Sequence, residues 1–538
     1  MLRTSSTFDS GLSREARSFD LPSELVIKIL ACLSPLDLLV CRLVCTTFDS
    51  IICGTAVLQY ILDLHRYGYA DRPSIASPTS DRLQALHEIQ NTYSHSNPRL
   101  TQTIIPNLAD CVPFPPPYKV QIMNHHGAHN GSFFLVVTGV HDPELFCLLD
   151  VTTVADSLTL GTGNVVHIDR LADLMPHVWF CFVDRDQDVL ITVTVHLGSN
   201  RVLHIMSLCE GISHPRACMP YIAVPMVKPD GYVEVIDIQG DYFTVKAGGN
   251  YEYRIHTDIH LYHWPSGTHV KHWAMTETHD CLDAALTEDG FILVSVRCHE
   301  PEENLHIQVW HIENVFEAIH IATFCLPHMI DHAGSWLICY WCRRSSMASP
   351  SCAVKPTYPG PLLHLSFHNS YSLFTTVDTF LPPYSWKEHS STEIPMFSWL
   401  EWGPLHTRVI KQSRDLRWVT TVSGYHVIFP HCIWDFSKES LRLANDMQNQ
   451  MTTSFLHPIY TMSTIPWKWQ QYDFLEDIVT QRPYCRVPLH LPKDYVPDID
   501  TTGIHSYYVE TMDGPKLMIF QTVSQTDKSI KSIDIITL

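Results

Sequence analysis

Hydrophobic positions in the first hundred residues follow the period of an α-helix. Pro22 suits the first position of a helix, and the next apolar residues share one helical face: Leu21, Leu25, Ile29, Leu30 and Leu33. Ser34 before Pro35 predicts the N-cap of a second segment whose apolar period runs to Ile51. Further helices are predicted from Thr55 to a left-handed stop at Gly68, and from Ser80 to Tyr93.

The helical period ends near residue 96. A run of prolines follows, at Pro98, Pro106, Pro113 and Pro115 to Pro117, and it predicts an extended linker over residues 97–118. We therefore divide the chain into a disordered tail (1–18), a helical module (19–96), this Pro-rich linker and a remainder (119–538).

The remainder has short runs of β-branched and aromatic residues, such as Val189 to Val195 and Phe291 to Val296, separated by polar clusters. Similar apolar strings begin at residues 146, 202, 260, 306 and 362, which by subtraction are 46–58 residues apart. This spacing favours a β-propeller-like domain of about six to eight blades. Another β-rich sandwich or barrel is the alternative. The predicted fold class is thus α+β multidomain, with helices first and a large all-β domain after them.

The helical module resembles the F-box. The resemblance rests on four strings in register, over roughly Phe19 to Leu58: Leu21-Pro22-Ser23-Glu24-Leu25, Ile29-Leu30 with Leu33, Pro35-Leu36-Asp37-Leu38-Leu39, and Val44-Cys45 with Phe48. It implies docking on the small adaptor of a cullin-based SCF ubiquitin ligase. About 40 residues cannot bury so many large apolar side chains alone, which also favours a partner surface. The expected adaptor-binding residues are Leu21, Pro22, Leu25, Ile29, Leu30, Leu33, Leu38, Leu39, Val44, Cys45 and Phe48.

A second resemblance concerns the whole layout. The strings Trp402-Gly403-Pro404, Thr407-Arg408 and Gly424 to Phe429, together with the N-terminal box and the length, look like the expanded F-box families of mushroom-forming (basidiomycete) fungi. This resemblance implies a receptor of unassigned substrate and adds no catalytic residue. Tryptophans at 386, 399, 402, 467 and 469 either pack the sheets or form a recognition face.

Charge and cysteine content narrow the partners. The 538 residues include 56 acidic and 36 basic side chains, for a formal net charge of −20, which disfavours nucleic acid and anionic membranes. No stretch reaches the roughly 18 apolar residues of a membrane helix, and residues 1–20 lack the apolar core of a signal peptide. The odd count of 17 cysteines favours reduced thiols, and hence the cytoplasm or nucleus.

The sequence lacks three common catalytic or nucleotide-binding motifs. There is no phosphate-binding loop, no G-x-S-x-G elbow and no H-E-x-x-H zinc motif. We interpret His125-His126-x-x-His129 as a solvated turn and the lone Cys339-x-x-Cys342 as buried or structural thiols. The sequence therefore predicts no catalytic residue, no cofactor and no metal.

The predicted function is that of a non-catalytic substrate receptor in an SCF-type ubiquitin ligase. The F-box would bind the adaptor and, through it, the cullin, while the β-domain holds an unidentified protein substrate close to the ubiquitin carrier. Two alternatives stay open: a scaffold that binds the adaptor outside the ligase, and an enzyme with an unrecognised site in the β-domain.

Overall fold

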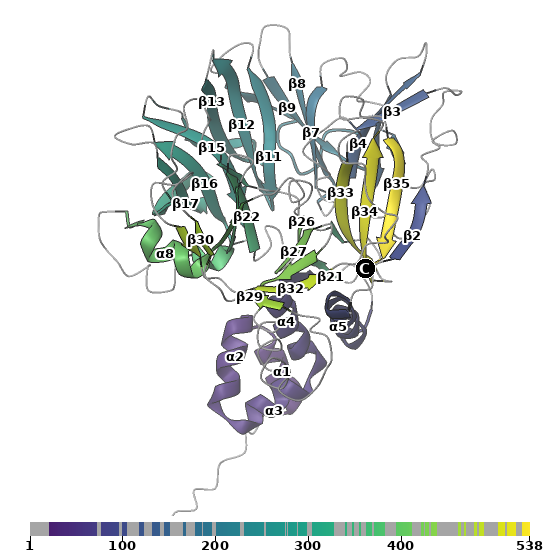
Figure 1. Cartoon of the computed structure of the whole chain (residues 1–538), viewed down its shortest axis with the longest axis vertical. Coiled ribbons are helices and arrows are strands. Elements are labelled where there is room, and N and C mark those ends of the chain that lie inside the picture. The colour runs from purple at the N-terminus through teal and green to yellow at the C-terminus, as the bar shows by residue number, and fades with distance from the viewer. Residues whose placement is uncertain are drawn as a thin grey trace, which may run out of the picture.

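In a computed structural model of the chain, helices dominate the N-terminal part and sheets dominate the rest (Figure 1). The structure describes residues 21–72, 77–95, 99–104, 118–122, 132–139, 145–150, 165–167, 178–184, 187–195, 201–225, 231–251, 254–274, 276, 278–287, 289–298, 304–327, 339–341, 347–348, 354–356, 362–367, 371–381, 394–411, 421–423, 425–429, 432–437, 461–463, 467–469, 478–480, 484–488, 504–511, 514–522 and 530–537.

Five helices make up the N-terminal part: α1 (Ser23–Leu30), α2 (Pro35–Val44), α3 (Thr46–Gly54), α4 (Ala56–Tyr67) and α5 (Thr79–His95). The predicted cap of α2 is confirmed, because Ser34 Oγ accepts the Asp37 N–H at 3.1 Å and donates to Asp37 Oδ2 at 2.7 Å. Gly68 ends α4 in the predicted left-handed conformation, with φ of 76°. Pro22 differs from the prediction, since it precedes α1 as the N-cap.

The apolar period after Ser34 belongs to two helices. Cys45 interrupts it with an extended backbone (φ −159°), and its Sγ accepts the Phe48 N–H that starts α3. The helices enclose a small core of six fully or nearly buried residues: Val26, Leu30, Leu38, Ile52, Leu58 and Leu62.

The strands of the described residues form seven sheets of four or five strands. In the order of the chain, the first four are built from β3 (Tyr118–Ile122), β4 (Ser132–Gly139), β5 (Leu145–Asp150) and β6 (Val165–His167); β7 (Val178–Asp184), β8 (Val189–Val195), β9 (Arg201–Ser207) and β10 (Tyr221–Val224); β11 (Tyr232–Gln239), β12 (Tyr242–Tyr251), β13 (Arg254–His263) and β14 (Thr268–Trp273); and β15 (His279–Leu286), β16 (Phe291–Cys298), β17 (Asn304–Asn314), β18 (Glu317–Cys325) and β24 (Met396–Phe397).

The other three sheets are built from β19 (Cys339–Trp341), β22 (Leu362–Phe367), β23 (Tyr371–Thr376) and β25 (Arg408–Lys411); β26 (Thr421–Ser423), β27 (His426–Phe429), β28 (Cys432–Asp435), β32 (Tyr484–Pro488) and β29 (Thr461–Ser463); and β2 (Arg99–Ile104), β35 (Ile530–Thr537), β34 (Gly514–Thr522), β33 (Ile504–Thr511) and β20 (Met347–Ala348). Two small pairs, β1 (Tyr69–Asp71) with β21 (Val354–Pro356) and β30 (Trp467–Trp469) with β31 (Ile478–Thr480), complete the strands.

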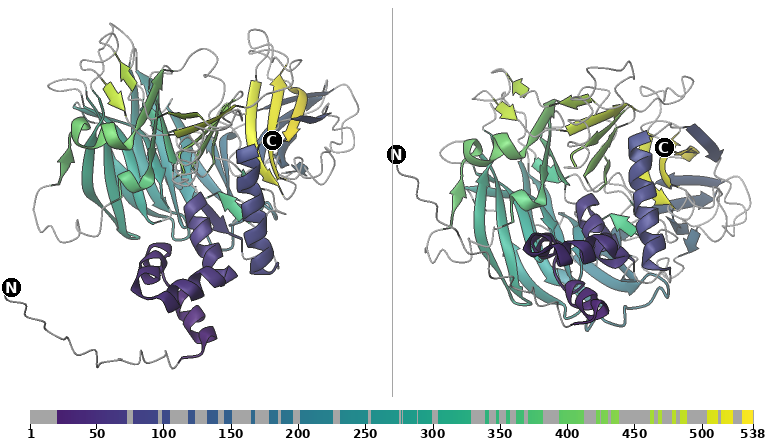
Figure 2. Two further views of the ribbon diagram at one scale, coloured as in Figure 1. Left: turned by 60° about the horizontal axis from the view of Figure 1, so that its bottom comes forward. Right: turned by 90° about the horizontal axis from the view of Figure 1, so that it is seen from below.

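Neighbouring strands within a sheet are mostly neighbours in sequence and run antiparallel, while β24 and β20 join their sheets in parallel. Consecutive sheets contact one another from β7 with β11 as far as β26 with β33, and β3 of the first sheet contacts β35 of the last (Figure 2). Apolar clusters fill the spaces between them, and one cluster contains Phe182 and Ile191 of the second sheet together with Phe243 and Val245 of the third. The predicted β-rich region is therefore present.

Two features of this region differ from the predictions. Arg99–Ile104, inside the predicted linker, forms β2 and pairs with β35 at the other end of the chain. The region also contains a short 3₁₀ helix (Val377–Thr379) and the helix α8 (Trp399–His406), so it is not entirely β. Trp399 and Trp402 of α8 are buried in the apolar cluster that includes Phe324 and Phe380, and they pack the core.

Among the described helices, none is by itself long and apolar enough to cross a membrane. Helices α3 and α4 satisfy the length and composition criteria only as a pair, and the pair is bent by 83°.

Candidate functional site

Helix α2 turns most of its large apolar side chains toward solvent. Leu36, Leu39, Val40, Leu43 and Val44 are 43–87% exposed and lie at i, i+3, i+4, i+7 and i+8. This spacing forms one stripe along a helix, and in a surface helix such a stripe normally faces the core. Only Leu38, on the other side of α2, is fully buried. The exposed stripe therefore has no partner within the described chain.

Helix α1, with the residue just before its N-cap, adds a second exposed row. Leu21, Leu25 and Ile29 recur every four residues and are 45%, 46% and 56% exposed. Val26 and Leu30, on the opposite face of α1, enter the core of the helical module. We call the two exposed rows together the apolar face: Leu21, Leu25, Ile29, Leu36, Leu39, Val40, Leu43 and Val44.

The predicted adaptor-binding residues divide by exposure. Leu21, Pro22, Leu25, Ile29, Leu39 and Val44 are exposed, and Leu33, Cys45 and Phe48 are half-buried. Leu30 and Leu38 are 3% and 0% exposed and pack in the core. Those two residues hold the helices together in this structure, and adaptor binding by the eleven residues stays a prediction.

Three residues of the apolar face were missed: Leu36, Val40 and Leu43. Their spacing with Leu39 and Val44 was visible in the sequence. A periodic stripe gives the face of a helix, but it does not say whether the protein's own core or a partner covers that face.

An ion pair fixes the turn beside this surface. Arg42 Nε of α2 lies 2.8 Å from Asp49 Oδ1 of α3. The hydrogen bond from Arg42 lowers the pKa of the Asp49 carboxyl, and the same bond raises the pKa of Arg42. Asp49 also accepts from the thiol of Cys53 at 3.4 Å. The pair connects α2 with α3 across the break at Cys45, beside the exposed stripe of α2.

Among the described residues, one group could hold a metal: Asp258, His260 and His272. The sequence motifs considered earlier do not supply it. His125, His126 and His129 lie outside the described residues, as does Cys342, the partner of Cys339 in β19.

Comparison with known protein families identifies the segment that carries this surface. Residues 19–61 match the family described as F-box-like. The chain carries an F-box-like domain. The match spans α1 to α3 and the start of α4, and so includes the whole apolar face. An F-box-like domain indicates an adaptor-binding subunit of SCF-type ubiquitin ligases.

Other comparisons add no relative. No curated protein matches the chain. Among solved structures, it is similar to prolyl oligopeptidase B from Galerina marginata, at 10% identity and a TM-score of 0.31, over 82% of this chain and 57% of that one. It is also similar to BamB from Moraxella catarrhalis, at 8% identity and a TM-score of 0.24, over 64% of this chain and 95% of that one. The resemblance to fungal F-box families stays a prediction.

Proposed function

We propose that this protein is the substrate-recognition subunit of an SCF-type ubiquitin ligase, and that the apolar face of its F-box-like domain binds the ligase adaptor. One observation carries the proposal: the segment that matches the family is also the segment in which eight large apolar side chains are at least 43% exposed. A large amount of exposed apolar surface in one short segment is typical of a protein interface.

The β-rich region, we propose, is a closed β-propeller of seven blades. The seven sheets follow one another in the chain, and each from the second onward contacts the next. The pairing of β2 with β35 supports closure, because it joins the beginning of the region to its end within one sheet. Ring closure of this kind protects sheet edges from other chains.

This region would hold the protein substrate and would itself be non-catalytic, acting in the cytoplasm or nucleus. Exposed apolar side chains around α8 are candidates for substrate contact: Ile394, Met396, Leu400 and Leu405. Fixing a substrate beside the ubiquitin carrier raises its effective concentration, and a receptor needs no catalytic group for that.

Affinity purification tests the proposal. The intact chain is compared with a chain that lacks residues 21–58, and the proteins retained by each are identified. We expect the adaptor and the cullin to disappear with the deletion, while substrates bound by the β-rich region remain. Adaptor without cullin on the intact chain would favour a scaffold, and retention of both after the deletion would refute the proposal.

A further inference from the structure

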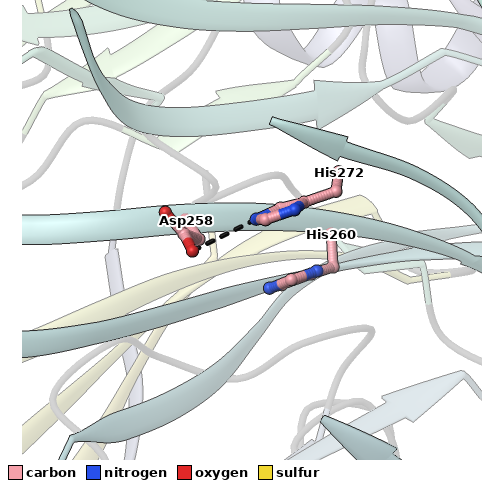
Figure 3. Close-up of side chains that lie close together, drawn as sticks. All are labelled: Asp258, His260 and His272. Atoms are coloured by element: carbon pink, nitrogen blue, oxygen red, sulfur yellow. Dashed lines mark hydrogen bonds and ion pairs between the residues drawn. The ribbon is translucent and has the colours of Figure 1, made fainter. Parts of the chain in front are cut away.

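Two neighbouring strands of the third sheet bring a carboxylate and two imidazoles together. Asp258 and His260 are two residues apart on β13, so their side chains lie on the same face of the sheet. His272 of β14 is the direct cross-strand partner of His260. Figure 3 shows both rings extending from their strands toward the side of Asp258. One ligand atom from each of the three lies within 4.8 Å of the other two.

The His260 ring is buried and lacks one hydrogen-bond partner. His260 is 1% exposed, and its Nε2 has no hydrogen-bond partner within the described chain. A buried polar atom without a partner is energetically unfavourable, and a bound ligand would relieve that cost. Asp258, also buried, holds His272 through a contact of 3.1 Å between Oδ2 and Nε2. The pocket of polar atoms thus includes an imidazole nitrogen that nothing in the described chain satisfies.

Hydrogen bonding indicates which nitrogen of His260 is free. Its Nδ1 lies 3.2 Å from Nε2 of His269. In the tautomer in which Nδ1–H of His260 donates across this contact, Nε2 of His269 accepts. Nε2 of His260 then carries a lone pair, as a metal ligand must.

We propose that Asp258, His260 and His272 bind a divalent transition-metal ion of the zinc class. Two imidazoles and one carboxylate are a donor set that zinc accepts, whereas calcium and magnesium prefer oxygen ligands alone. The His272 side chain is 39% exposed, so an ion can enter from the β14 side and solvent can fill the fourth position. This proposal departs from the expectation of no metal drawn from the sequence.

The geometry requires one adjustment. The His260 and His272 rings are stacked, with centroids 4.4 Å apart and planes inclined by 9°. Zinc–nitrogen bonds of about 2.0–2.1 Å in a tetrahedron place two nitrogens roughly 3.3 Å apart. His272, whose side chain is 39% exposed on the edge strand β14, would be the ring that turns, exchanging its contact with Asp258 for a bond to the ion that Asp258 also binds. His269 would support His260 from the second layer, as the partner of the other ring nitrogen of a ligand.

The test is a zinc titration of the full chain, stripped of metal and followed by calorimetry with a weak competing chelator. Asp258→Asn and His272→Gln remove proposed ligands, and His279→Gln replaces an exposed histidine of β15 as the matched control. We expect one tight equivalent of zinc in the wild type and the control, bound at least tenfold more weakly in both ligand variants. Cobalt in place of zinc should give visible absorption bands that the ligand variants lose.

Folding of the variants is checked by thermal unfolding without metal, where His272→Gln should match the wild type because its side chain is partly exposed. Calcium and magnesium should not compete with zinc. Equal zinc affinity in the wild type, Asp258→Asn and His272→Gln would overturn the proposal. So would a tight equivalent that His279→Gln removes and the ligand variants keep.

Discussion

Arg82 of α5 holds both carboxylate oxygens of Asp71, with Nη1 2.7 Å from Oδ1 and 2.8 Å from Oδ2. The hydroxyl of Tyr60, in α4, donates to the same carboxylate at 2.7 Å. Asp71 is the last residue of β1, which pairs with β21 in the β-rich region. One side chain therefore connects two helices with the strand that joins the helical and β-rich parts. A fixed junction matters for a receptor, since it sets the position of a bound substrate relative to the adaptor.

Asp71→Asn should loosen this junction. The neutral amide loses the charge that Arg82 faces, and Arg82 is only 17% exposed in its side chain, so we expect a loss of about 1 kcal/mol. Hydrogen exchange should become faster in β1, β21 and α5. Asp49→Asn, which breaks the exposed pair with Arg42, is the control and should leave these segments protected. Equal exchange in Asp71→Asn and the wild type would show that the ion pair does not hold the junction.

Leu43→Asp should abolish adaptor binding without unfolding the protein. Leu43 is 87% exposed, so stability should change by no more than about 0.5 kcal/mol, while adaptor affinity falls at least tenfold. Phe316→Asp, an exposed apolar change in the β-rich region, is the matched control and should bind normally. Leu38→Ala, in the core, should instead cost about 2–5 kcal/mol of stability. Affinity and thermal unfolding are measured on all three, and normal adaptor affinity of Leu43→Asp would contradict the proposed interface.

The sequence predicts local structure here better than it predicts pairing. Ser34 and Gly68 mark helix ends through bonds and dihedrals confined to a few residues, and both were read correctly. The break at Cys45 carries no proline or glycine, so no local signal marks it. The pairing of Arg99 with Thr537 brings together two segments that lie far apart in the sequence. No local pattern of residues encodes such a contact.

For the candidate sites too, local features could be predicted from the sequence and contacts between separate elements could not. The F-box strings are contiguous and could be recognised, but the helical period alone does not separate Leu38, which is buried, from Leu39, which is exposed. Asp258-x-His260 on one strand was visible in the sequence. Its meeting with His272 depends on the register of β13 and β14, which includes an irregularity between Leu261 and Tyr262.

Gly403→Ala should destabilise the protein although Gly403 lies in a helix. Alanine gains about 1 kcal/mol in helix propensity. A Cβ at this position, however, would overlap the buried ring of Trp399, and such overpacking costs about 1–3 kcal/mol. Gly54→Ala is the matched control, because a Cβ at this helical glycine of α3 meets nothing within 4 Å and should be neutral or stabilising. Thermal unfolding decides, and a higher midpoint for Gly403→Ala would show that Trp399 moves aside freely.

Strand β2 should stabilise the β-rich region by closing it. Two truncated chains, one beginning at Asn97 and one at Ile105, differ only in the segment that contains β2. Removal of β2 leaves β35 as an unpaired edge, and we expect the shorter chain to lose about 2–5 kcal/mol from its backbone pairs and to associate more readily. Denaturant unfolding and light scattering measure both effects. Equal stability of the two chains would count against closure through this pairing.

Stability should fall in acid because of His260. Its pKa is about 3 in the folded protein and near 6.5 when unfolded, so between these values the unfolded state binds the extra proton. Burial is the largest cause of this low pKa, His272 and His269 lower it further, and Asp258 and Tyr262 also lie beside the ring. With chelator present, the contribution of His260 to the free energy of unfolding should be constant above about pH 6.5. Below that pH the contribution should decrease. From pH 7 to pH 5 the wild type should lose about 2 kcal/mol more than His260→Gln, which has no group to titrate there.

Denaturant unfolding at each pH measures this difference in slope, which does not depend on any constant loss of stability in the variant. Parallel curves for the two proteins would mean that the folded state accommodates a charged His260 or that a neighbouring group takes the proton in its place.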